Sequence, residues 1–263
     1  MSSSKTVLIN SENRQSGSSS SFAYAIPNDG DYQYVAVLGC NIPVSYYLIQ
    51  EPYNTFTLIE EGLNIKIHIP EGNYNVNSFR KVLKGLLNTE TLHSWVYDVI
   101  FENDYAGRAT GKYTYTCTGF TSSPPSFVFP DDGELHSQFG FDHGSTNTFD
   151  NIGGLRSTAV VNFIPETVLT IQSDICEDSN LLTIFHDNAQ PNSNISFQCQ
   201  TQAYKKKLRR NCKDSWYTFS LLSKNGTNIN LNGQPILLNL LLFNDDDKYK
   251  RDIQDYIRYR ISN

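Results

Sequence analysis

The five histidines are the residues of this chain best suited to bind a metal or to move a proton. None lies in H-x-H, H-x-x-x-H or H-E-x-x-H spacing, so the patterns of cupin-type and metalloprotease-type sites have no support. Two of the histidines lie near a loop rich in carboxylates. That loop either forms a metal or acid–base site or is a solvated acidic surface. The histidines are His68, His93, His136, His143 and His186, and the carboxylates are Asp131, Asp132, Glu134 and Asp142.

The five cysteines are scattered along the chain, and no two of them have C-x-x-C spacing. We therefore expect reduced, partly buried thiols rather than a zinc site or a disulfide framework. No G-x-S-x-G motif, P-loop or Rossmann glycine pattern occurs either. The sequence thus predicts no catalytic residue, no metal, no cofactor and a chain that is not an enzyme. The cysteines are Cys40, Cys117, Cys176, Cys199 and Cys212.

The sharpest charge feature is a basic segment at residues 205–213. It contacts nucleic acid or another anionic partner, acts as a nuclear address, or is a solvated loop between two strands. The whole chain has 21 Lys and Arg against 27 Asp and Glu, a net charge of −6, which argues against a dedicated nucleic-acid binder. Any contact with a genome is therefore expected to be local. The candidate contact residues are Lys205, Lys206, Lys207, Arg209 and Arg210.

The elements that must position these groups are predicted to be strands. Aromatic residues make up 13% of the chain and charged residues only 18%, which argues against disorder and against a helical bundle. Residues 63–69 alternate between apolar and polar, which predicts a half-buried strand. Residues 236–243 are nearly all apolar and predict a central strand that is buried on both faces. The pair Asn225-Gly226 predicts a hairpin turn.

Two segments depart from the strand pattern. Apolar residues from Phe79 to Leu87 fall on one stripe, which predicts a single inserted helix. We expect Asn77 or Ser78 to cap the start of this helix. A second helix is expected in the charged tail at residues 245–263, which either docks on a partner chain or covers its own domain.

More than eight predicted strands with one intervening helix predict an all-β fold, a β-sandwich of two antiparallel sheets. Because no linker or internal repeat is visible, we expect one domain. Residues 1–21 are predicted as a flexible arm with a short strand, residues 22–244 as the sandwich, and residues 245–263 as the tail. No apolar run is long enough for a signal peptide or a membrane span.

Several short segments, taken in order, resemble the jelly-roll capsid proteins of tailless icosahedral double-stranded DNA viruses. The resemblance is to the vertex (penton) and minor capsid proteins of virophages, polinton-like viruses and their giant-virus relatives. It spans roughly residues 5 to 243. The segments are residues 9–14, 34–38, 42–47, 54–58, 69–74 (IPEGNY), 110–115, 139–141 and 228–232.

The resemblance implies a shell-building protein of the virion, assembled in the cytoplasm or nucleus of a host. A jelly roll needs eight strands in two sheets, so this length suits one roll and not a fused pair. Penton proteins of this kind have one roll and form pentamers beside the trimers of the major capsid protein. A closed five-fold ring needs a heterologous interface, and exposed tyrosines suit such contacts. The candidate interface residues, which alternatively lie in the domain's own core or rim, are Tyr46, Tyr47, Tyr53 and Tyr74.

Two other functions are compatible with the sequence. One is a minor capsid protein at a position other than the vertex. The other is a carbohydrate-binding β-sandwich that serves as an attachment module, because loops rich in aromatic residues, Asn and Asp can stack on sugars and hydrogen-bond to them.

Overall fold

The computed structural model describes residues 4–27, 30–104, 106–121, 123–130, 135–187, 190–200, 205–209 and 216–244. The predicted C-terminal helix at residues 245–263 lies outside these residues. No helix among them is long and apolar enough to cross a membrane.

The chain divides into two compact units. Unit 1 comprises Met1–Tyr46 and Glu166–Asn263, and unit 2 comprises Tyr47–Pro165. The sequence patterns predicted one continuous sandwich over residues 22–244, and the structure differs because the segment 47–165 buries a hydrophobic core of its own. Each unit is therefore described by itself.

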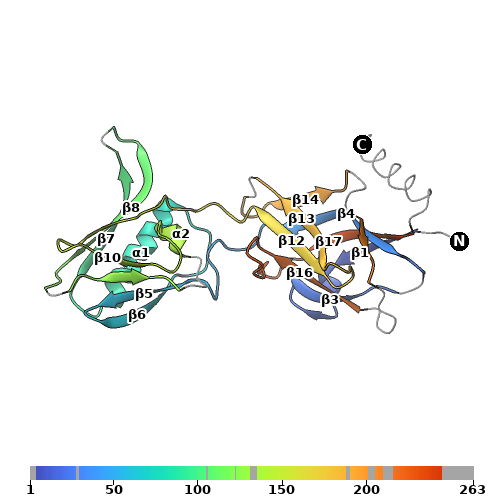
Figure 1. Ribbon diagram of the computed structural model, residues 1–263, viewed down its shortest axis with the longest axis horizontal. Coiled ribbons are helices and arrows are strands. Elements are labelled where there is room, and N and C mark those ends of the chain that lie inside the picture. Colours follow the sequence, from blue (N-terminus) through green and yellow to red (C-terminus); the bar gives the residue numbers. More distant parts are fainter. Residues whose placement is uncertain are drawn as a thin grey trace. The chain divides into compact units, whose positions relative to one another are not determined.

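Unit 1 consists of two antiparallel sheets (Figure 1). The first sheet has the order β1-β17-β4-β14, and β15 also pairs with β4. The second sheet has the order β13-β12-β16-β3-β2. The first sheet contains β1 (Ser4–Asn10), β17 (Leu237–Phe243), β4 (Tyr34–Pro43), β14 (Asn194–Gln198) and β15 (Lys205–Lys207). The second sheet contains β13 (Asn180–Phe185), β12 (Val168–Ser173), β16 (Trp216–Leu222), β3 (Ser21–Ala25) and β2 (Ser16–Gly17).

The strand order of unit 1 is that of a single jelly roll. If β1, β3, β4, β12, β13, β14, β16 and β17 are numbered one to eight along the chain, the two sheets read 1-8-3-6 and 5-4-7-2. Each sheet therefore pairs strands that are distant in sequence, as two interleaved Greek keys require. The predicted all-β fold with one jelly-roll sandwich is confirmed. Unit 2 is inserted into the connection between the third and fourth strands of the roll, β4 and β12.

Strand β17 lies inside the first sheet and contributes side chains to hydrophobic clusters on both faces of that sheet. It lies between β1 and β4, and Leu238, Leu240 and Leu242 point into the main core between the sheets. On its other face Leu241 and Phe243 are buried in a second, smaller cluster. The predicted central strand is confirmed, and its outer face is buried at Leu241 and Phe243 but not at Leu237, which is 38% exposed.

The serine-rich segment before β3 is packed onto the roll, although the sequence predicted a flexible arm. The Ser11 backbone N–H donates to the carbonyl of Ile236 at 3.0 Å, and the Ser11 hydroxyl accepts from the Ile236 N–H at 2.9 Å. Ser11, Ser19 and Ser20 are buried. The Ser11 hydroxyl tolerates burial because the Ile236 backbone N–H donates to it.

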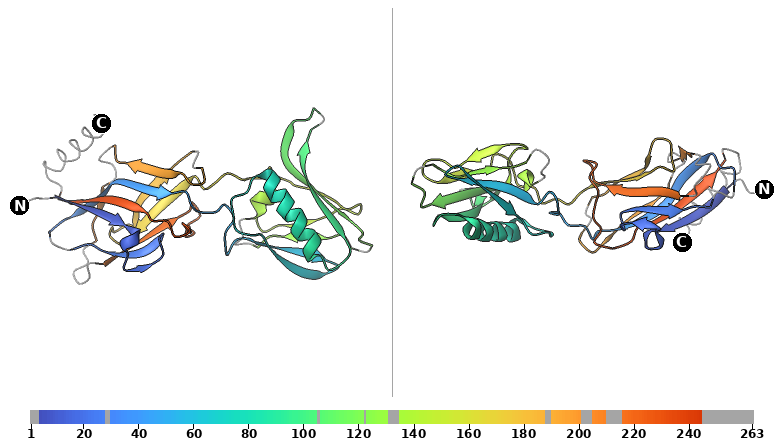
Figure 2. Two further views of the ribbon diagram at one scale, coloured as in Figure 1. Left: turned by 180° about the vertical axis from the view of Figure 1, so that it is seen from behind. Right: turned by 90° about the horizontal axis from the view of Figure 1, so that it is seen from below.

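The described part of unit 2 has two helices and two further sheets, with strand orders β10-β9-β5-β6 and β11-β8-β7. Helix α1 packs against β7 and covers one side of the unit (Figure 2). The strands are β5 (Thr55–Glu60), β6 (Leu63–His68), β7 (Val96–Asn103), β8 (Ala109–Thr118), β9 (Ser126–Val128), β10 (Thr146–Thr148) and β11 (Gly154–Arg156). The helices are α1 (Val76–Glu90) and α2 (His136–Phe139).

In unit 1 the segment Ser11–Asn13 forms the short 3-10 helix η1.

Helix α1 confirms the predicted inserted helix, and its buried stripe contains Phe79, Leu83 and Leu87. The predicted cap at Asn77 or Ser78 is wrong, because Asn75 is the N-cap. Its Oδ1 accepts from the backbone N–H groups of Asn77 and Ser78, and the Ser78 hydroxyl accepts from the Asn75 N–H at 2.9 Å. This reciprocal capping box satisfies free N–H groups of the first turn.

A buried carboxylate joins β5 to the loop that follows α1. Glu60 is fully buried, and its Oε1 accepts from the hydroxyl groups of Tyr97 and Thr91, each at 2.8 Å. Its Oε2 accepts from the backbone N–H of Leu92 at 3.0 Å. Three donors around one buried acid make it a structural anchor, since a buried charge is tolerated only when it is fully hydrogen-bonded.

Candidate interaction surfaces

The basic segment is partly neutralised by acidic neighbours. Lys205–Lys207 form β15, where Lys206 Nζ lies 2.7 Å from Asp178 Oδ2 and Lys207 Nζ lies 2.9 Å from Glu177 Oε1. The hydrogen bond from Lys206 lowers the pKa of Asp178. These contacts reduce the positive charge that this strand presents to a partner.

Of the two arginines in the predicted contact set, only Arg209 is among the described residues. Arg209 donates from Nη2 to the carbonyl of Glu177 at 3.2 Å, and Arg210 lies outside the described residues. Lys205 Nζ stands 4.5 Å from the ring centre of Tyr34, on the outer side of the first sheet. An anionic partner for this segment stays a prediction.

Of the four candidate tyrosines, Tyr46 belongs to unit 1 and the other three belong to unit 2. Tyr46 lies in the core of unit 1, and burial raises the pKa of its hydroxyl to about 12. Tyr74 donates to the carbonyl of Pro70 at 2.6 Å and packs edge-on against Phe79. Tyr53 is half-buried and Tyr47 is exposed. Of the four, Tyr47 presents the most ring surface to a partner.

The structure brings His136 and His143 together, with ring centres 5.2 Å apart and nearly perpendicular planes. The carboxylates predicted beside them at positions 131, 132 and 134 lie outside the described residues. Within the described parts of the chain, no group of three or more His, Cys, Asp and Glu side chains is arranged to hold a metal.

Four of the five cysteines are described, all four are buried, and none of these four is part of a disulfide. Burial raises the pKa of Cys40 and Cys176 to about 12 and that of Cys117 to about 11. Such groups stay as thiols at neutral pH and are poor nucleophiles.

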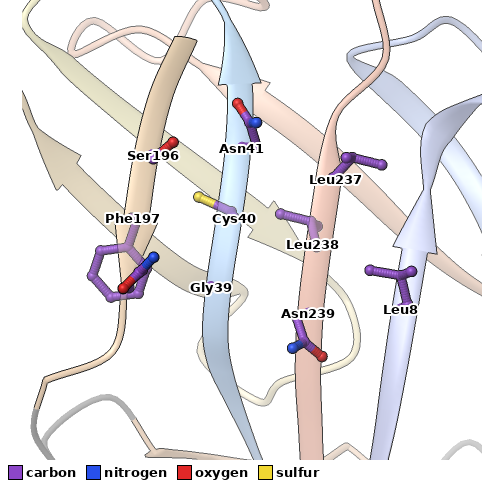
Figure 3. Close-up of a pocket in the computed structure, with 10 residues that line it drawn as sticks. Leu8, Gly39, Cys40, Asn41, Ser196, Phe197, Leu237, Leu238 and Asn239 are labelled. Carbon is purple, nitrogen blue, oxygen red and sulfur yellow. The ribbon is translucent and has the colours of Figure 1, made fainter. Parts of the chain in front are cut away.

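The outer face of the first sheet contains a hollow of about 290 Å³ (Figure 3). Its floor is Gly39 on β4, which has no side chain and pairs with Asn239 of β17 on one side and with Gln198 of β14 on the other. We call this the amide hollow. Its lining contains no charged side chain and consists of Leu8, Gly39, Cys40, Asn41, Ser196, Phe197, Gln198, Leu237, Leu238 and Asn239.

Two backbone features create the amide hollow. The pairing of β17 with β4 shifts between Asn239 and Leu240, so that Leu38 is an extra residue on β4. Gly39 follows this bulge and does not adopt a left-handed backbone conformation. The backbone conformation at this position does not require glycine. The absence of a side chain instead leaves open space above the sheet.

Two amide oxygens in the amide hollow have no hydrogen-bond partner. The Oδ1 atoms of Asn41 and Asn239 are both buried and unpaired in the structure. An unpaired buried acceptor costs roughly 1–3 kcal/mol until a donor reaches it. Leu8 and Leu237 are exposed at the rim of the hollow. The hollow therefore has an apolar rim, and the two unpaired amide oxygens are buried beneath its surface.

The outer face of the second sheet bears two exposed aromatic residues, and Asp174 Oδ1 accepts from the backbone N–H of Thr218 on β16 at 2.7 Å. Phe185 on β13 is 79% exposed and Trp216 on β16 is 45% exposed. Both belong to the outward-facing set, because their strand neighbours Ile184 and Tyr217 point into the core. The other outward residues of these strands and of β3 and β12 are small or neutral: Ser21, Ala23, Ala25, Val168, Thr170, Gln172, Asn180, Thr183, Thr218 and Ser220.

Sequence reasoning missed both outer faces. The available signals were a glycine inside a predicted strand, Gly39, and a single asparagine in an apolar run, Asn239. Either residue is unusual in a strand, where glycine marks a close approach and asparagine is disfavoured. Neither signal says on its own which neighbouring strands complete the site.

Comparisons with known proteins give matches among solved structures only. No protein-family model matches the chain, and no curated protein matches it. Among solved structures, the chain is similar to the selenomethionine-labelled crystal structure of the mavirus penton protein. The two are 14% identical, the match covers 91% of this chain and 99% of that chain, and the TM-score is 0.41.

Proposed function

We propose that this chain is a structural capsid protein that forms the pentameric vertex capsomer of an icosahedral DNA virus shell. The observation that carries the proposal is the strand order of unit 1, which makes one jelly roll, whereas the described strands of unit 2 form two sheets of a different order. A single roll is the form expected of a vertex protein of the lineage that the sequence resembles. The proposed role is non-enzymatic, and the proposed location is the virion.

The proposed partners are four further copies of the chain and the neighbouring trimers of a major capsid protein. Tyr47, which is exposed, is the candidate tyrosine best placed for such contacts. Contact with the genome is proposed only for β15, where Lys205, Lys206 and Lys207 lie beside acidic neighbours.

The mass of the purified full-length chain in solution tests the proposal. A species of five times the chain mass of 29.8 kDa is expected at high protein concentration, and electron microscopy of that species should show five-fold symmetry. A chain that stays monomeric both in solution and with the major capsid protein would contradict the proposal. A stable assembly of another symmetry would favour a minor capsid position away from the vertex.

The carbohydrate-binding alternative depends on aromatic rings that reach the surface. In unit 2 the largest aromatic side chains, among them Tyr97, Tyr113 and Tyr115, are fully buried. These rings are therefore unavailable to stack on a sugar, and a glycan array is the direct test of the alternative.

A further inference from the structure

His186 is a titratable side chain of unit 1 to which the proposed function gives no role. It follows β13 directly, and its backbone N–H donates to the carbonyl of Thr167, the residue before β12, at 3.0 Å. We propose that protonation of His186 releases the end of β13 from the second sheet, so that the roll contains an acid-sensitive contact. The proposal concerns the single chain and does not depend on the vertex role.

The surroundings of the imidazole ring are the first argument. Both ring nitrogens of His186 are buried, and neither has a hydrogen-bond partner among the described residues. A neutral imidazole has one N–H donor, whereas the protonated ring has two donors and a positive charge. Protonation in place therefore buries a charge and two donors without acceptors, which costs more free energy than burial of the neutral ring.

Two carboxylates oppose this cost. The negative charges of Glu166 and Asp187 both favour the protonated ring of His186. The Glu166 carboxylate already accepts from the backbone N–H of Thr167 at 3.0 Å and from that of Lys224 at 3.4 Å. Asp187 is exposed, so water and salt screen its charge. Burial outweighs the two carboxylates and holds the pKa of His186 below its usual value of about 6.5.

Two further titratable residues contact Glu166 from neighbouring segments. The Tyr46 hydroxyl donates to the carbonyl of Glu166 at 3.4 Å, and burial raises the pKa of this hydroxyl to about 12. Tyr46 therefore stays neutral in acid. Lys224 contributes its backbone N–H, and its side chain is exposed.

The position of β13 makes the release local. β13 is the outer strand of the second sheet, and among the described strands it pairs only with β12. Its last paired residue is Phe185, opposite Val168, and the His186–Thr167 hydrogen bond extends this pairing by one step. The end of the strand can therefore separate while the pairing of β12 with β16 stays intact.

The direction of the pH effect follows from linkage. A histidine whose pKa is lower in the closed site than in the open one takes up a proton when the site opens. The open population therefore grows as the pH falls below about 6.5, by up to about tenfold for each pH unit. Growth stops when the pH reaches the lower pKa of the closed site. Above about pH 6.5 the closed site keeps its full stability.

Hydrogen exchange of backbone amides in the full chain tests this proposal. After correction for the intrinsic pH dependence of exchange, protection of the His186 amide should fall by up to about tenfold per pH unit below about 6.5. The Leu221 amide, which donates to the carbonyl of Ser20 at 2.8 Å in the same unit, should keep its protection. Protection at His186 that does not change with pH would overturn the proposal.

Two matched variants identify the titrating group. His186→Phe keeps an aromatic ring that does not titrate, so protection at position 186 should no longer depend on pH. His68→Phe replaces an exposed histidine on β6 of unit 2 and should leave the acid response of the wild type unchanged. An acid response that survives in His186→Phe, or that disappears in His68→Phe, would contradict the role of His186.

A direct titration does not require His186→Phe to fold. The ring signal of His186 in the NMR spectrum of the wild type should report a pKa below about 6.5. Glu166→Gln removes a carboxylate charge and keeps an acceptor oxygen for the backbone, so it should lower the pKa of His186 further. A wild-type pKa at or above about 6.5, or a higher pKa in Glu166→Gln, would overturn the proposal.

Discussion

The two units of this chain fill their cores in different ways. Among the described residues, 4 of the 26 buried core residues of unit 1 are aromatic, against 11 of 20 in unit 2. In unit 1 long alternating strands such as β4 and β17 place branched aliphatic side chains between two sheets. In unit 2, β9, β10 and β11 have three residues each, and aromatic rings fill the space that such short strands leave.

This difference shows that most of the buried aromatic residues of the described chain lie in unit 2. The rings are concentrated inside the inserted unit, where they contact one another, and few remain on the surface of the roll. In the described part of unit 1 the exposed aromatic residues are Phe185 and Trp216, and they are informative because the other described rings of the roll are at least partly buried.

The largest effect is expected from Phe139→Ala, which removes the ring at the centre of the unit 2 core. Its ring centre lies 4.7 Å from that of Phe56, 5.0 Å from Phe129 and 5.4 Å from Phe79. Loss of a buried phenylalanine costs about 3–5 kcal/mol. We expect unit 2 to unfold more readily while unit 1 keeps its stability.

Thiol labelling under native conditions distinguishes the units, because Cys117 lies in the core of unit 2 and Cys40 and Cys176 lie in that of unit 1. Phe139→Ala should accelerate labelling at Cys117 alone. The matched variant Phe219→Ala, in the core of unit 1, should show the opposite pattern. Equal acceleration at all three cysteines in either variant would show that the two units unfold as one.

The next effect is expected from Glu60→Ala, which leaves the donors of Tyr97, Thr91 and Leu92 without their acceptor. A loss of roughly 3 kcal/mol in the stability of unit 2 is expected, measured by urea unfolding and Cys117 labelling. Tyr97→Phe removes only one of the donors and should cost less. A larger loss from Tyr97→Phe than from Glu60→Ala would contradict the role of Glu60 as an anchor.

A small effect is expected from Asp178→Asn in unit 1. The ion pair with Lys206 lowers the pKa of Asp178, so its stabilisation is present above the unfolded pKa and is lost as the pH falls through the lower folded pKa. Because the pair is exposed, about 0.5 kcal/mol is expected at pH 7. Thermal unfolding at pH 7 and at acid pH should show the wild type and the variant converging in acid.

The smallest effect on the roll is expected from removing unit 2 altogether. The Tyr46 hydroxyl donates to the carbonyl of Glu166 at 3.4 Å, so the two ends of the insertion lie close together. Replacing residues 47–165 by a short Gly/Ser linker should leave the thermal unfolding of unit 1 unchanged. A roll that fails to fold without unit 2 would show that unit 1 does not fold independently.

Local patterns predicted much of the fold. The run 236–243 and the stripe from Phe79 to Leu87 were recognisable because burial on two faces and burial on one helical face leave different periods. The two-unit division was missed because the junctions at Tyr46 and Glu166 carry no linker composition. The amide hollow was missed for a different reason: it is assembled from four strands whose pairing depends on the whole roll.

The pairing of β1 with β17 has a consequence for synthesis of the chain. In the described sheets β1 pairs only with β17, so β1 cannot enter its sheet before residues 237–243 have been translated. Residues 47–165 emerge in between, in time to bury their aromatic core first, since domains generally fold as units during translation. Asn239 lies on β17, so the amide hollow is completed only after nearly the whole roll has been translated.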